Sequence, residues 1–199
     1  MKVALFGTSA DPPTIAHQEI ISWLASQSDR VAVWASDNPF KTHGASLEQR
    51  SQMLELLIEE IKPPLDRSTQ VYRNLSSRRT FESLITAREI WADSEFVLTV
   101  GADLVTQLPQ WYRASELLTQ VKLLIVPRTG TTIESADLQR LKDLGAQIAI
   151  APLSTPIISS TVVRNSHSSQ GITPSVARYI QQHNLYSIFD ESRDRAKLK

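Results

Sequence analysis

The sequence predicts an α/β protein, a single domain built on a doubly wound parallel sheet, and three observations carry this prediction. Short apolar runs alternate with amphipathic helical stretches along the chain. The apolar runs are continuous, which is typical of strands buried on both faces of a parallel sheet. With 199 residues the chain can bury one full core without cross-links. Strand–helix alternation of this kind implies right-handed crossovers.

The expected elements follow from composition and periodicity. Strands are expected where Val, Ile, Leu and Ala dominate, at Lys2–Phe6, Arg30–Ser36, Phe96–Gly101, Lys122–Pro127 and Gln147–Leu153, with a weaker candidate at Gln70–Asn74. Helices are expected between them, at Ile15–Gln27, Ser46–Ile61, Thr80–Ala92, Ala102–Leu108, Ile133–Leu144 and Ser175–His183. Residues 1–188 form the expected domain, with a small helical part at its C-terminal end. Residues 189–199 are of mixed charge and are expected to form a flexible tail.

The composition excludes several classes of protein. The chain has no cysteine, which excludes disulfides, thiolate metal sites and cysteine nucleophiles. Its 21 basic and 21 acidic residues balance, which argues against a nucleic-acid or membrane-surface partner. The apolar runs are too short to span a bilayer, and Asp11 comes too early for a signal-peptide core. We therefore expect a soluble, cytoplasmic protein.

In doubly wound sheets ligands bind beyond the carboxyl ends of the strands, so the segment after the first strand is of interest. It contains neither of the two common glycine-rich phosphate loops. Thr14 and His17 lie three residues apart at a helix start, so both side chains project near a helix N-terminus, which attracts anions. Taken alone, however, this short pattern is better explained by a threonine cap and a surface histidine.

A second segment, Ile158–Arg164, follows the last strand. Its adjacent hydroxyls and backbone N–H groups stand at a helix start, and Arg164 follows Thr161 by three residues. Donors of this kind together with a bidentate cation suit an anion. An ordinary serine cap with a solvated arginine is the simpler alternative. The two segments together, at the first and last crossovers of one sheet, favour phosphate chemistry.

These two motifs, [TH]-x-x-H after the first strand and I-S-S-T-x-x-R near the C-terminus, resemble the nucleotidylyltransferases of the Rossmann-like superfamily. Within it the chain resembles the bacterial nicotinate-nucleotide adenylyltransferase family. Further matches are Gly101-Ala102-Asp103 with Leu108-Pro109-Gln110-Trp111, Asn38-Pro39-Phe40-Lys41 with Arg50 and Met53, and Val176…Tyr179-Ile180…Leu185-Tyr186. The resemblance covers most of residues 1–188.

The chain departs from the family pattern at several positions. Where the family has G-G-T-F-D-P-x-H-x-G-H, this chain carries Thr8, Ala10, Thr14 and Ala16. The region Arg73–Leu84 matches the family's S-Y-T-x-D-T-L poorly and keeps only Thr80 and Leu84. These differences affect how the substrate is recognised and do not change the class of reaction that the resemblance implies.

The resemblance implies a Rossmann-like fold and transfer of AMP from ATP to nicotinate mononucleotide, giving deamido-NAD and pyrophosphate, with Mg²⁺ accompanying ATP. His17, Thr14 and Arg164 are the implied catalytic residues. The implied ATP-binding residues are Gly7, Thr8, Ser9, Asp11, Gly101, Asp103, Ser159, Ser160 and Thr161. Lys41, Thr80 and Trp111 are the implied substrate-binding residues, and no protein metal site is implied.

Several alternatives stay open at this point. Asp103 is equally well explained as a helix N-cap, and Trp111 as partial core. Trp23, Trp34 and Trp91 are interpreted as core, and His43, His167 and His183 as surface residues. The acceptor could instead be nicotinamide mononucleotide or another phosphate, and the protein could be a non-catalytic nucleotide sensor on the same fold. ATP and a pyridine mononucleotide are the expected partners, and a homo-oligomer is left open.

Overall fold

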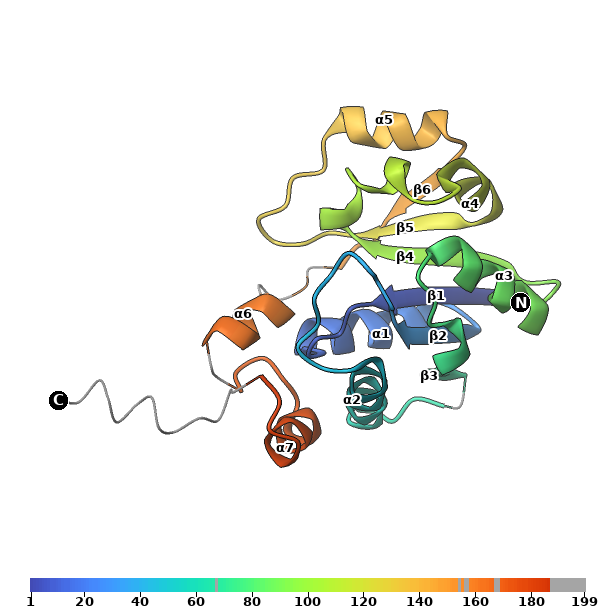
Figure 1. The fold of residues 1–199 in the computed structure, drawn as a ribbon. Coiled ribbons are helices and arrows are strands. Elements are labelled where there is room, and N and C mark those ends of the chain that lie inside the picture. The colour runs from blue at the N-terminus through green and yellow to red at the C-terminus, as the bar shows by residue number, and fades with distance from the viewer. Residues whose placement is uncertain (67, 154, 156–157, 167–168, 187–199) are drawn as a thin grey trace.

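A computed structural model describes residues 1–199 with the exception of 67, 154, 156–157, 167–168 and 187–199 (Figure 1). The expected tail at 189–199, its boundary at residue 188, and His167 lie outside the described residues. The strands are β1 (Lys2–Thr8), β2 (Arg30–Ala35), β3 (Thr69–Val71), β4 (Glu95–Gly101), β5 (Lys122–Val126) and β6 (Gln147–Ile150). The α-helices are α1 (Ile15–Gln27), α2 (Leu47–Glu59), α3 (Thr80–Ile90), α4 (Ala114–Gln120), α5 (Ser135–Asp143), α6 (Ser160–Ser166) and α7 (Pro174–Gln182). Short 3₁₀ helices are η1 (Arg73–Leu75), η2 (Ala102–Leu104) and η3 (Leu108–Gln110).

The sheet has six strands in the order β3-β2-β1-β4-β5-β6, and its strand pairs are all parallel. The strands β1, β2 and β3 follow one another toward one edge of the sheet, and β4 then pairs with the other side of β1. Val3 accordingly pairs with Arg30 on one side and with Phe96 on the other. In doubly wound sheets a reversal of strand order of this kind marks where ligands bind, here at the carboxyl ends of β1 and β4. The doubly wound fold expected from the sequence is confirmed.

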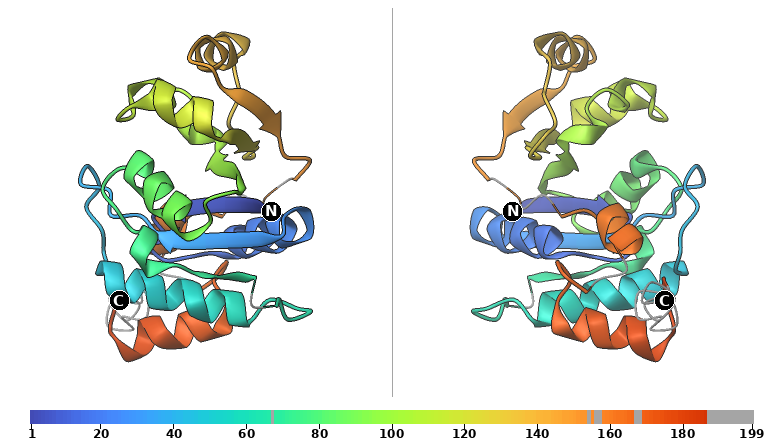
Figure 2. Two further views of the ribbon diagram at one scale, coloured as in Figure 1. Left: turned by 90° about the vertical axis from the view of Figure 1, so that its right-hand side faces the viewer. Right: turned by 90° about the vertical axis from the view of Figure 1, so that its left-hand side faces the viewer.

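Helices pack on both faces of the sheet (Figure 2), and each face carries its own apolar core. The alternation of side chains along β1 shows the division, because Ala4 and Phe6 point into one cluster and Val3 and Leu5 into the other. Helices α1, α2, α6 and α7 cover the first cluster, and α3, α4 and α5 cover the second. Trp34 is 2 % exposed, as expected of a core residue, and Trp23 and Trp91 pack partly buried against the two clusters.

Four local expectations were wrong. Strand β1 extends past Phe6, the expected end of this strand, through Gly7 and Thr8. Strand β6 is not buried on both faces: it is an edge strand, and Ile150 is 51 % exposed. The expected helix at Ala102–Leu108 is replaced by the two short turns η2 and η3. Helix α4 was not predicted, because its seven residues are too few to display helical periodicity.

None of the helices in the described part of the chain combines the length and the apolar character that crossing a lipid bilayer demands.

Candidate active site

The centre of the site is the imidazole of His17, held at both ring nitrogens. The backbone N–H of Thr14 donates to Nδ1 at 3.1 Å, and the Thr14 hydroxyl lies 2.9 Å from the same nitrogen. Nε2 lies 2.9 Å from Oγ1 of Thr8, the last residue of β1. Thr14 is the N-cap residue of α1, as one of the sequence interpretations expected. His17, in contrast, is a partly buried residue with fixed partners and not an incidental surface histidine.

His17 is electrically neutral at physiological pH. Burial lowers the pKa of His17 to about 4, and the positive charge of Arg128 lowers it further in the same direction. Since a backbone N–H can only donate, Nδ1 must accept, and the single ring proton of the neutral imidazole therefore belongs to Nε2. The tautomer follows from these partners, and it makes Nε2 a hydrogen-bond donor at the carboxyl end of β1.

A second group of contacts surrounds Asp11, whose side chain is almost fully buried. Its carboxylate accepts hydrogen bonds from the backbone N–H of Gly44 at 2.8 Å and of Ala45 at 3.2 Å. The Tyr186 hydroxyl donates to Oδ1 at 2.7 Å, and His43 Nδ1 lies 3.5 Å from Oδ2. Asp11 therefore joins the turn after β1 to the loop before α2 and to the end of the described chain.

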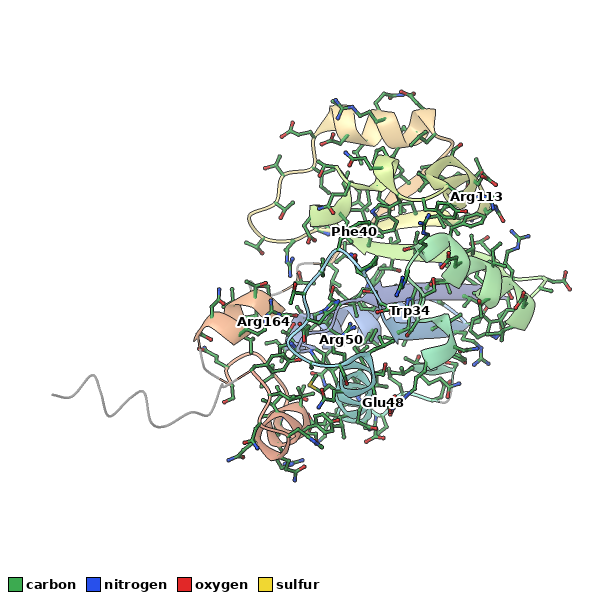
Figure 3. All side chains as sticks on the ribbon, viewed as in Figure 1. Trp34, Phe40, Glu48, Arg50, Arg113 and Arg164 are labelled. Atoms are coloured by element: carbon green, nitrogen blue, oxygen red, sulfur yellow. The ribbon has the colours of Figure 1, made fainter. Side chains whose placement is uncertain are left out.

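The segment after the last strand reaches this same turn. The Arg164 guanidinium donates to the backbone oxygen of Asp11 and lies 3.7 Å from its carboxylate. The Ser160 hydroxyl donates to the backbone oxygen of Pro12 at 2.7 Å, across 148 residues of sequence. The two segments that favoured phosphate chemistry in the sequence thus touch in the fold. Figure 3 shows Arg164 and Arg50 reaching toward the end of β1 from α6 and α2.

The remaining hydroxyls of this segment have distinct roles. Ser159 Oγ accepts from the N–H of Val162 at 3.2 Å and so caps α6. Thr161 is exposed, and its hydroxyl accepts a long 3.4 Å contact from Arg164. A serine cap, the simpler sequence alternative, is therefore correct for Ser159, whereas Arg164 is anchored to the site rather than solvated.

Asp103 follows β4, the strand beside β1 in the sheet. It stands inside η2 rather than at its N-cap, which is Gly101, so the N-cap interpretation was wrong. Asp103 instead forms a 3.4 Å ion pair with Arg128, the residue whose charge acts on His17. One expected glycine is required by packing, because a Cβ on Gly7 would meet the buried Trp34 ring at 2.6 Å. A Cβ on Gly101 would meet only the carboxylate end of the half-exposed Asp103 side chain, at 2.5 Å, and that side chain can turn away.

Lys41 and Arg50 connect the loop before α2 to the site. Lys41 Nζ donates to Ser9 Oγ at 3.3 Å, close to the exposed Phe40 at the loop tip (Figure 3). Arg50 is 1 % exposed and donates to the backbone oxygens of Ser9 at 2.8 Å and Ser36 at 2.9 Å. A buried guanidinium thus ties together the ends of β1 and β2.

Thr80 and Trp111 belong to a neighbouring cluster on α3 and η3. Both neighbours of Thr80 contact Tyr112, the residue after Trp111. The Arg79 guanidinium lies 4.1 Å above the Tyr112 ring, and Phe81 meets that ring edge-on at 6.4 Å. Trp111 is half-buried and packs against the second core cluster. The structure therefore brings together the two segments that carry Thr80 and Trp111, and Trp111 is partly core as well as partly accessible.

Three residues of the site were not predicted from the sequence. Arg128 lies two residues beyond β5, and its position past a strand end was the available signal. His43 was interpreted as a surface residue, yet its side chain is only 14 % exposed beside Asp11. Burial lowers the pKa of His43, and the charge of Arg50 acts in the same direction. Tyr186 was noted only as part of a motif, and no local pattern indicates its contact with Asp11. His183 is exposed, as expected.

Comparison with known proteins shows which family the chain belongs to. A family model described as cytidylyltransferase-like matches residues 5–166. The chain belongs to this family of nucleotidyltransferase-type proteins. The family expected from the motifs is thereby confirmed.

More narrowly, the chain is similar to proteins named for one reaction. It is 45% identical over 199 residues to a probable nicotinate-nucleotide adenylyltransferase of Synechocystis, an alignment that covers 94% of this chain and 99% of the relative. It is 23% identical to the nicotinate-nucleotide adenylyltransferase of Bacillus subtilis, with 93% and 98% covered. The fold matches a Plasmodium falciparum nicotinic acid mononucleotide adenylyltransferase complexed with NaAD, with a TM-score of 0.80, 19% identity, and 96% and 99% of the two chains covered.

Proposed function

We propose that this protein transfers the adenylyl group of ATP to nicotinate mononucleotide, giving deamido-NAD and pyrophosphate. One structural observation supports this proposal most strongly. The turn that contains Asp11 and Pro12 is bonded directly to Arg164 and Ser160, so the first and last crossovers of the sheet form one polar site. The 45% identical relative with the same named activity supports the same reaction.

The chemistry asks mainly for positioning and charge stabilisation. A phosphate oxygen of the mononucleotide attacks the α-phosphorus of ATP in line, and pyrophosphate leaves. The attacking phosphate is already ionised near neutral pH, so no general base is needed. Neutral His17 acts as a hydrogen-bond donor through Nε2–H to the charge that develops on the α-phosphate, and Thr14 holds the ring from the other side.

Two cationic side chains, Arg164 and Lys41, bind different phosphate groups. Arg164, with its side chain 32% exposed, keeps part of its guanidinium accessible beside Thr161 and holds the leaving pyrophosphate. Lys41, whose Nζ donates to Ser9 Oγ, neutralises a substrate phosphate. The nucleotide binds at the strand ends, which carry Gly7, Thr8, Ser9, Gly101 and Asp103.

Trp111 and Thr80 form the acceptor pocket in this proposal. The exposed part of the Trp111 indole offers a flat apolar surface on which a pyridine ring stacks. The backbone N–H groups around residues 102–108 supply donors for a carboxylate, which favours nicotinate over nicotinamide.

Mg²⁺ enters with ATP as part of the substrate. Among the described residues no group of three or more His, Asp or Glu side chains is arranged to hold a metal ion. Mg²⁺ keeps most of its water ligands and binds readily to phosphate oxygens, which fits a metal carried by the polyphosphate.

The test is pyrophosphate release from ATP with a panel of mononucleotides: nicotinate, nicotinamide and a non-pyridine control. We expect turnover with the pyridine mononucleotides and the highest kcat/KM with nicotinate mononucleotide. Turnover only with another phosphate acceptor would mean that the acceptor is not a pyridine mononucleotide. Absence of turnover in a folded preparation that binds ATP would favour a nucleotide sensor instead.

A further inference from the structure

The contact between Thr8 and His17 has a consequence for how the imidazole is aimed. Thr8 Oγ1 lies 2.9 Å from Nε2 of His17, and the two residues come from different elements, the end of β1 and the first turn of α1. The family pattern quoted above carries glycine at the Thr8 position, so this hydroxyl is a departure from that pattern.

The direction of this hydrogen bond is fixed by the other side of the ring. Nδ1 accepts from the backbone N–H of Thr14 at 3.1 Å, and so the one proton of the neutral imidazole is on Nε2. Nε2–H donates to Thr8 Oγ1. The hydroxyl, having accepted, keeps its own proton and can donate that proton onward.

We propose that Thr8 is a positioning residue for His17: its hydroxyl fixes the imidazole with Nε2–H directed toward the carboxyl end of β1. The Thr14 contacts anchor the ring at Nδ1 alone, and the ring can still tilt about that point. The Thr8 contact anchors the opposite corner. Phe6, whose ring centre lies 6.3 Å from that of His17, bounds the imidazole on a further side.

This geometry joins three groups in one hydrogen-bonded chain, from the Thr14 N–H through the imidazole to the Thr8 hydroxyl. Each donor in such a chain is polarised by the one before it, which strengthens the last donor. The catalytic consequence rests on the proposed adenylyl transfer. There, a phosphate oxygen takes the place of Thr8 Oγ1 as the acceptor of Nε2–H, which the Thr8 contact has already aimed at the carboxyl end of β1.

The first experiment is spectroscopic and independent of activity. In ¹⁵N-labelled protein without ligand, we expect a protected, downfield Nε2–H proton for His17. Thr8→Val keeps the shape and removes the acceptor, so this signal is lost to solvent exchange, and Thr8→Ser restores it. Thr119→Val is the matched control, because the Thr119 hydroxyl donates to a backbone oxygen within α4. An unchanged His17 signal in Thr8→Val would overturn the proposal.

The second experiment is a double-mutant cycle with His17→Gln. We expect Thr8→Val to lower kcat by about tenfold with little change in the ATP KM. If Thr8 acts through His17, adding Thr8→Val to His17→Gln lowers kcat no further. Losses that multiply would mean that Thr8 acts on the nucleotide independently and would refute the positioning role.

Two further checks keep these outcomes distinct. Thr8→Gly removes the same hydroxyl without the branched side chain, and it replaces Thr8→Val if the latter does not fold. If the wild-type protein shows no adenylyl transfer, the proposed function fails while the spectroscopic result still decides how His17 is held.

Discussion

The hydroxyl of Tyr186 donates a 2.7 Å hydrogen bond to Oδ1 of Asp11, across 175 residues of sequence. Burial raises the pKa of Tyr186, and the hydrogen bond to the Asp11 carboxylate acts in the same direction, so the phenol keeps its proton. The ring packs tightly against the loop before α2, because a Cβ on Gly44 would come within 2.8 Å of it. One tyrosine thus fixes both the turn after β1 and the loop that carries Lys41.

Replacement of Tyr186 tests the energetic value of this contact. Tyr186→Phe keeps the ring and removes the donor to a buried carboxylate, so we expect the free energy of unfolding to fall by about 1–2 kcal/mol. Urea denaturation measures the change. Tyr112→Phe is the control, because Tyr112 is 47% exposed and should lose much less. Equal losses in the two variants would contradict a specific role for the Tyr186–Asp11 bond.

The lowered pKa of His17 predicts a pH-dependent stability. The pKa is about 4 in the folded protein and 6.5 in the unfolded chain, so the unfolded chain binds the proton more tightly. This contribution is fully present above pH 6.5 and is lost as the pH falls toward 4. Between pH 7.5 and pH 5 we expect a loss of about 2 kcal/mol from this one group.

The measurement compares urea denaturation of the wild-type protein and of His17→Gln at both pH values. Glutamine does not titrate, and its side chain can still accept from the Thr14 N–H, as in a capping box. His43 is present in both proteins, and its contribution therefore cancels. Identical pH dependence in the two proteins would place the titration elsewhere.

Substitutions of His17 and of Arg164 should change different kinetic parameters. His17→Ala removes a donor aimed at charge that develops during the reaction, so we expect kcat to fall by about 10²–10³ with little change in ATP binding. Arg164→Ala also removes a contact with ground-state phosphate and should raise the ATP KM as well. Steady-state kinetics with varied ATP measures both effects.

Arg140→Ala controls for removal of an arginine, because Arg140 is exposed and pairs with Asp137 within α5. A near-neutral kcat in His17→Ala would assign the imidazole a purely structural role.

Trp111 should determine use of the acceptor. We expect wild-type kcat/KM to favour nicotinate over nicotinamide mononucleotide by at least about tenfold, because an amide leaves one pocket donor facing another. Trp111→Ala should raise the KM for the mononucleotide and leave that for ATP nearly unchanged, whereas Trp111→Phe keeps an aromatic surface and should recover part of the loss. Equal kcat/KM values for both mononucleotides would refute the acceptor preference. An unchanged mononucleotide KM in Trp111→Ala would mean that Trp111 has only a structural role in the core.

The sequence predicted the sheet well because buried parallel strands have a composition of their own. Continuous apolar runs such as Lys122–Val126 need no knowledge of their neighbours. Helix α4 and the turns η2 and η3 escaped prediction because they are short and are stabilised by contacts with the core, such as those of Leu108 and Leu117. Local periodicity carries little signal over so few residues.

The site was predictable only in part, for a similar reason. Thr14 and His17 lie within one helical turn, so their proximity follows from helix geometry. The pairing of Arg128 with Asp103 and the burial of His43 against Asp11 depend on which segments the fold brings together. No spacing within one segment encodes such contacts, and a single sequence therefore marked the residue types at strand ends without assigning their partners.

The Tyr186 and Arg164 contacts join parts of the chain that are synthesised far apart in time. The turn after β1 leaves the ribosome early, but Arg164 and Tyr186, which bond to Asp11, are made 153 and 175 residues later. Until then the Asp11 carboxylate lacks two of the partners that it has in the folded protein. A chain that ends before Tyr186 therefore carries this carboxylate without its tyrosine donor, which costs free energy when the carboxylate is buried.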